Sequence, residues 1–272
     1  IDSHWDLDGQ WLVEVGITSI PGRYDLPDSS SIEIDDLWEY MQSLYDVFPE
    51  PDYLMLHIDQ YGTQMQPILQ LIPRMTSLTA LHLDWVYNEA EEWEQIEAVR
   101  WLNAFSTFQL NQLKYVSLGL THCQMSTADL FDFLEPMSQL QSLKIQNMNV
   151  PPTWQLLCLP PLPELRQLMI FLTPITPFQL PVLPALTKLN LHGGGDDSWL
   201  PNLSAMTSLE SLSWNNFVNS HLVSLTQFLP PQIENIYMYG NLQPVLSDVE
   251  LNALWTNMMK LTRLTSLSIP QL

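Results

Sequence analysis

The apolar residues of this chain recur at a fixed spacing, in which a first position is followed by others three and five residues later. The stretch LQSLKI shows this spacing at Leu140, Leu143 and Ile145. The last two positions alternate with polar neighbours, which predicts a short strand with one buried face. Clear copies begin at Leu78, Leu113, Leu140, Leu165, Leu186, Leu209, Ile233 and Leu264.

Two looser copies precede the clear ones. Their triplets are Leu12, Val15 and Ile17, and then Tyr53, Leu56 and Ile58. A single copy cannot bury its own apolar side chains, so neighbouring copies must stack into one parallel sheet over a continuous core. The pattern therefore predicts a single domain over residues 1–272 with about ten stacked units.

The segments between the copies predict two kinds of return. Helical patterns cover residues 35–47 and 88–106, and Ser126 with Asp129 and Ser247 with Glu250 have the spacing of helix-starting capping boxes. Residues 151–210 contain ten prolines. Because proline disrupts helix interiors, we expect extended or 3₁₀ returns there.

The L-x-x-L-x-L core and the spacing of its copies resemble leucine-rich repeats, whose period is about 20–29 residues. The resemblance covers nearly the whole chain. It implies an α/β solenoid shaped as a horseshoe, with a parallel concave sheet and mixed helical and extended convex returns. The family's usual asparagine after the strand is missing from most copies; only Asn241 fits. The chain therefore looks more like the irregular intracellular type, loosely similar to F-box-type substrate receptors.

The net charge of the chain narrows the class of molecule that it is expected to bind. The chain has 30 Asp and Glu against 9 Lys and Arg, a formal net charge of −21. Such a surface repels phosphate backbones, so we expect no nucleic acid partner, and it favours a basic protein or peptide, or serves solubility alone. No apolar run is long enough for a membrane span. The two cysteines are too few for a disulfide framework, which favours an intracellular location.

Strand alternation predicts which side chains line the concave face, because the residues two, four and six places after the first position of each copy point away from the core. Those that we select as candidate partner-binding residues are Met55, His57, Asp59, His82, Asp84, Tyr115, Lys144, Gln146, Met169, Phe171, Lys188, Asn190, His192, Asn215, Tyr237 and Tyr239.

The aromatic and methionine residues of this set predict interface anchors, unless a flanking loop covers them. Phe171 and Met169 are expected beside Tyr115, Tyr237 and Tyr239. The two lysines of the set could pair with an acidic group of a ligand, or with a neighbouring polar residue of the chain itself.

A second candidate site is a metal site. The stretches HID and HLD place His57 and Asp59 at the same positions as His82 and Asp84 in the next copy. Two histidines and two carboxylates side by side could ligate a divalent metal, whereas the alternative is an ordinary polar ladder. The sequence offers no other sign of a cofactor.

Enzyme motifs are scarce. None of the nine glycines builds a serine-hydrolase elbow, a phosphate-binding loop or a dinucleotide fingerprint. We therefore expect a non-catalytic scaffold that binds a protein or peptide on its concave face, and a substrate-recognition subunit is one specific form of it. The alternatives are a structural subunit of a large assembly and a metal-binding protein or enzyme. Because solenoid ends are normally capped, the uncapped last copy favours truncation at both ends or a bound neighbour.

Overall fold

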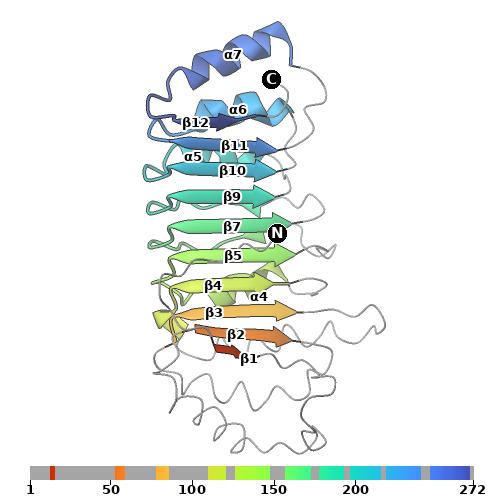
Figure 1. Cartoon of the computed structure of the whole chain (residues 1–272), viewed down its shortest axis with the longest axis vertical. Coiled ribbons are helices and arrows are strands. Elements are labelled where there is room, and N and C mark those ends of the chain that lie inside the picture. The colour runs from red at the N-terminus through yellow and green to blue at the C-terminus, as the bar shows by residue number, and fades with distance from the viewer. Residues whose placement is uncertain are drawn as a thin grey trace, which may run out of the picture.

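The computed structural model describes residues 13–15, 53–58, 78–85, 110–120, 126–147, 157–172, 178–192, 197–215, 219–239 and 246–269. Within these residues, ten parallel strands stack in sequence order into one sheet (Figure 1). The strands are β1 Val13–Val15, β2 Tyr53–Ile58, β3 Ala80–Trp85, β4 Tyr115–Gly119, β5 Ser142–Asn147, β7 Gln167–Leu172, β9 Lys188–His192, β10 Ser211–Asn215, β11 Asn235–Tyr239 and β12 Ser266–Ser268.

The eight clear copies align as the spacing predicts. In every neighbouring pair from β3 to β12, the residue at the second apolar position lies opposite its counterpart. These residues form a column across the sheet, namely Leu81, Val116, Leu143, Leu168, Leu189, Leu212, Ile236 and Leu267. A parallel sheet with helical returns, an α/β solenoid-like arrangement, is therefore confirmed.

The predicted register of the two looser copies against the clear ones is wrong by two residues, because Leu54, not Leu56, lies opposite Leu81. Their register with each other is as predicted, with Val15 opposite Leu56. A shift of two residues keeps every side chain on the same face of a strand, so alternation alone cannot detect it. Because β2 carries apolar residues at three alternate positions, its sequence fits either register.

Two predicted helical returns are confirmed, and the structure adds a helix and a 3₁₀ helix that the sequence did not predict. Helix α4 spans Thr127–Leu134 and helix α7 spans Asp248–Met258, each beginning at its predicted capping box. Helix α6 spans Asn219–Phe228. A short 3₁₀ helix, η5, spans Leu110–Gln112. The helices predicted over residues 35–47 and 88–106 lie outside the described residues.

The proline-rich returns are thin, as predicted, with one exception. Strands β6 (Leu157–Cys158) and β8 (Phe178–Gln179) are extended and pair in parallel as a second, two-stranded sheet. The 3₁₀ helix η6 spans Asp197–Trp199. The exception is α5, Leu200–Leu203, a short α-helix in a segment where we expected none. It tolerates Pro201 because the proline lies in the first turn, where the missing N–H would have no helical partner.

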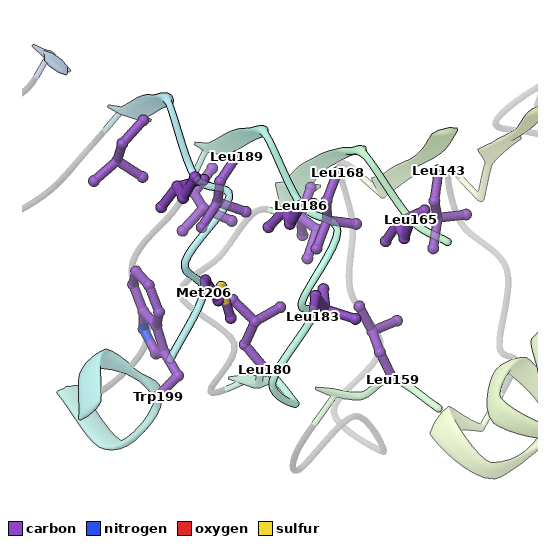
Figure 2. Packing of buried hydrophobic residues seen from close by; sticks show 14 of the residues in the cluster. Leu143, Leu159, Leu165, Leu168, Leu180, Leu183, Leu186, Leu189, Trp199 and Met206 are labelled. Carbon is purple, nitrogen blue, oxygen red and sulfur yellow. The ribbon is translucent and has the colours of Figure 1, made fainter. Parts of the chain in front are cut away.

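The core lies between the sheet and the returns. Strand residues such as Leu143, Leu168 and Leu189 meet Leu159, Leu180, Leu183, Trp199 and Met206 from the returns (Figure 2). The rings of Trp199 and Trp214 pack edge to face with their centroids 5.2 Å apart. The same core takes in buried leucines of α4, α5, α6 and α7, so these helices cover one face of the sheet.

The core is open at its C-terminal end. The first seven members of the leucine column described above are at most 3% exposed, whereas Leu267 on β12 is 39% exposed. Helix α7 also presents Val249, Trp255 and Met259 to solvent. Among the described helices, none combines the length and the hydropathy that a membrane span requires.

Position within the column determines the cost of truncating a leucine. Leu168→Ala is expected to lower the free energy of unfolding by about 2 to 5 kcal/mol, because it empties a fully buried site. Leu267→Ala, the same change in the same column at the open end, is expected to cost about 1 kcal/mol. Urea denaturation of the two variants measures the difference. Equal losses would contradict the stacked core.

The capping box of α7 makes a prediction about pH. The Ser247 hydroxyl and then its backbone N–H, both donating to Glu250 Oε2 at 2.7 Å, lower the pKa of Glu250 below its usual 4.5. Because the folded pKa is lower, the stabilisation is present above pH 4.5 and is lost as pH falls through the folded value. Ser247→Ala should raise the pKa of Glu250 toward 4.5 in a carboxyl NMR titration. Ser126→Ala, in the box of α4, is the control that should leave it unchanged.

Candidate functional site

The candidate site is the face of the sheet that points away from the core. We call it the open face and define it as the alternate positions of β4 to β12 that face away from the buried leucines. Its side chains are half-buried or exposed in most strands, while their neighbours along each strand are buried. Helices α4, α5 and α6 lie behind the strands in the view of Figure 1, and α7 lies beyond the last strand at the C-terminal end.

The register sorts the open face into three columns. One column runs through Tyr115, Ser142, Gln167, Lys188, Ser211 and Asn235. The middle column runs through Ser117, Lys144, Met169, Asn190, Ser213 and Tyr237. The third runs through Gly119, Gln146, Phe171, His192, Asn215 and Tyr239. The predicted residues from Tyr115 onward therefore share one face, as strand alternation requires.

The centre of this face is a contact group from three strands. Lys144 on β5 holds its Nζ 5.8 Å from the centroid of the Phe171 ring on β7. On the other side, the Phe171 and His192 rings have centroids 6.0 Å apart and planes tilted by 33°. A cation within about 6 Å of an aromatic face is attracted by the ring quadrupole. Phe171 is thus held between two nitrogen-bearing side chains and remains half-buried.

The predicted aromatic cluster is only partly assembled. Met169 lies opposite Lys144 and Asn190, next to the Phe171 group. Tyr237 and Tyr239 are on β11, three strands from Phe171, where Tyr239 is 49% exposed. Tyr115 is on β4, two strands away on the other side. At about 4.8 Å per strand, the tyrosines are two or three strand spacings from Phe171 and flank it at a distance.

Two buried polar atoms on the open face lack partners. Asn190 Oδ1 and His192 Nδ1 are covered, yet neither has a hydrogen-bond partner within the described part of the chain. A buried polar atom without a partner costs about 1 to 3 kcal/mol, so such atoms are uncommon and call for an explanation. Both lie on β9, beside Met169 and Phe171. Sequence reasoning selected these residues but could not show that their atoms lack partners.

The predicted histidine and aspartate ladder is contradicted by the register. His82 lies opposite Met55, and His57 lies opposite Asp84, so the two histidines are not paired across the strands. The error follows from the two-residue register shift of β2 described above. Asp59 lies outside the described residues. Within the residues that are described, no three His, Cys, Asp or Glu side chains group together as metal ligands would.

Comparisons with known proteins do not add a function to this geometry: no protein-family model matches the chain, and no curated protein matches it significantly.

The Phe171 group can be tested in solution. Phe171→Leu removes the ring but keeps an apolar side chain, so the NMR signals of the Lys144 ε-methylene and the His192 imidazole should lose their ring-current shifts. Tyr239→Leu, a matched change on the same face two strands from His192, should leave both signals in place. Unchanged signals in Phe171→Leu would show that the three side chains do not meet.

Proposed function

We propose that this chain is a non-catalytic binding scaffold of the leucine-rich repeat type, whose open face holds a segment of a protein or peptide partner. The observation that carries the proposal is the Phe171 group at the centre of the sheet face that none of the described helices covers. A half-buried aromatic ring and a methionine, ringed by amide and hydroxyl side chains, match the composition of interface anchors. An exposed sheet face without function is normally more uniformly polar.

The resemblance of the repeats gives the proposal its finer form. In that form the sheet is the concave wall of a horseshoe, and the chain recognises substrates for a larger complex, as F-box-type receptors do. The in-register leucine column supports the repeat assignment, because equivalent positions of successive copies occupy equivalent places. The packed core holds the sheet rigid, and the side chains of the three columns contact the partner.

The second candidate function is a structural subunit that is buried at its C-terminal end in an assembly. It is favoured by the open core end, where Leu267 is far more exposed than the rest of its column, and by Trp255 and Met259 on α7. A large apolar surface at a solenoid end normally receives a cap or a neighbour.

A peptide selection discriminates the two candidates. Random peptides selected on the immobilised chain should bind at least about tenfold more weakly to the double variant Phe171→Ala with Tyr237→Ala, because anchors of an interface carry most of its binding energy. Trp255→Ala, which removes an exposed aromatic side chain from α7, is the control and should bind normally. Fluorescence anisotropy measures each affinity. If only the Trp255 variant lost peptide binding, the binding site would lie at the C-terminal end and not on the open face.

A further inference from the structure

The open face has a charge opposite to that of the rest of the chain. The segments 114–119, 141–147, 166–172 and 187–192, which hold β4, β5, β7 and β9 with the residues just before them, contain no Asp or Glu. They contain Lys144 and Lys188 on the open face, and Lys114 and Arg166 directly before β4 and β7; we call these four residues the basic patch. The chain as a whole has 30 acids against 9 bases, so this distribution is the reverse of its composition.

Among the described residues, no acidic side chain pairs with the basic patch. Lys114, Arg166 and Lys188 are exposed and Lys144 is half-buried. Within the described part of the chain, the ion pair that is resolved joins Arg263 to Glu234 at 2.6 Å and involves none of the four. The open-face positions of β4 to β12 hold no Asp or Glu. Glu210, which directly precedes β10 next to β9, lies outside these positions.

The two buried polar atoms on β9 set a second requirement for a ligand of the open face. Asn190 Oδ1 can only accept a hydrogen bond, and neutral His192 can accept one at Nδ1. Both atoms are covered, so a ligand reaches them only when the two side chains turn outward, and it must then bring donors as well as negative charge. A polypeptide has both, because its backbone N–H groups recur at every residue beside its carboxylates. A phosphodiester backbone has acceptors alone, and its continuous charge is repelled by the net −21 of the chain.

We propose that the open face from β4 to β9 binds an acidic peptide segment of a protein partner. Asp or Glu side chains of the segment pair with Lys144 and Lys188, and its backbone N–H groups donate to Asn190 and His192. Phe171 packs against an apolar side chain of the segment. This inference rests on the proposed function and replaces, for this face, the basic partner that the total charge suggested.

The test uses the peptides selected on the wild-type chain from a random library. Asp and Glu should be enriched among them, and their affinity should fall about tenfold for Lys144→Gln with Lys188→Gln. The matched control, Lys260→Gln with Arg263→Gln, removes the same charge from outside the patch and should change affinity by less than about twofold. Equal weakening by both pairs would show a bulk charge effect and overturn the proposal.

A charge swap guards against misfolded variants. Lys144→Glu with Lys188→Glu should weaken the acidic peptides and bind their counterparts in which Lys replaces Asp and Glu, a gain that an unfolded chain cannot mimic. A fluorescent oligothymidylate of equal charge is titrated alongside, and tighter binding of it than of the peptides would overturn the assignment to a polypeptide.

The outcomes separate this inference from the proposed function. Selected peptides that lack acidic residues but still lose binding in the Phe171 and Tyr237 variant would overturn the acidic assignment and keep the binding face. If neither this variant nor the lysine variant affected the binding of the selected peptides, both the proposed function and the acidic-peptide inference would be overturned.

Discussion

The in-register stacking of one leucine per strand is the constraint on which the rest of this structure depends. Each strand is too short to hold a core by itself, and each return supplies only a few apolar side chains. The column from Leu81 to Ile236 is buried only because every strand has a neighbour on both sides. Since alternation ties the two faces of a strand together, fixing the buried column also fixes which side chains stand on the open face.

The alignment of the leucine column also aligns the side chains of the open face. Lys144, Phe171 and His192 come from three strands that are about 25 residues apart in sequence, yet they meet because their leucines are aligned. The face is also where the chain departs from its own composition, with cations and amides in place of carboxylates. An acidic surface around a small basic area would hold a short acidic segment locally while repelling extended polyanions.

The sequence predicted the fold well where the repeat was unambiguous. From Leu78 onward, the first apolar position identifies which of the alternate residues enters the column, and the structure agrees. It failed where Leu54, Leu56 and Ile58 offered two equivalent choices, and the predicted side-by-side placement of His57 and His82 failed with it. Pro201 shows a different limit, because a proline excludes helix interiors but not the first turn.

For the site, alternation predicted the members of the face but not their contacts. It could not tell that the tyrosines lie strands away from Phe171, since that depends on the strand order. It also could not show that Asn190 Oδ1 and His192 Nδ1 are covered and unpartnered, because this depends on how neighbouring side chains pack. The sequence shows that strands β4, β5, β7 and β9 contain no Asp or Glu. Only the register shows that the residues of these strands lie next to one another.

Cysteine cross-linking measures the central claim most directly. In a background without the two native cysteines, Gln167→Cys with Lys188→Cys places two thiols on directly opposed residues of β7 and β9, whose Cα atoms lie about 5 Å apart. Gln167→Cys with Asn190→Cys is two residues out of register, at about 8 Å, beyond the reach of a disulfide. The account predicts that mild oxidation cross-links the first pair and not the second. Cross-linking of the second pair in preference to the first would contradict the stacked register and the open face built on it.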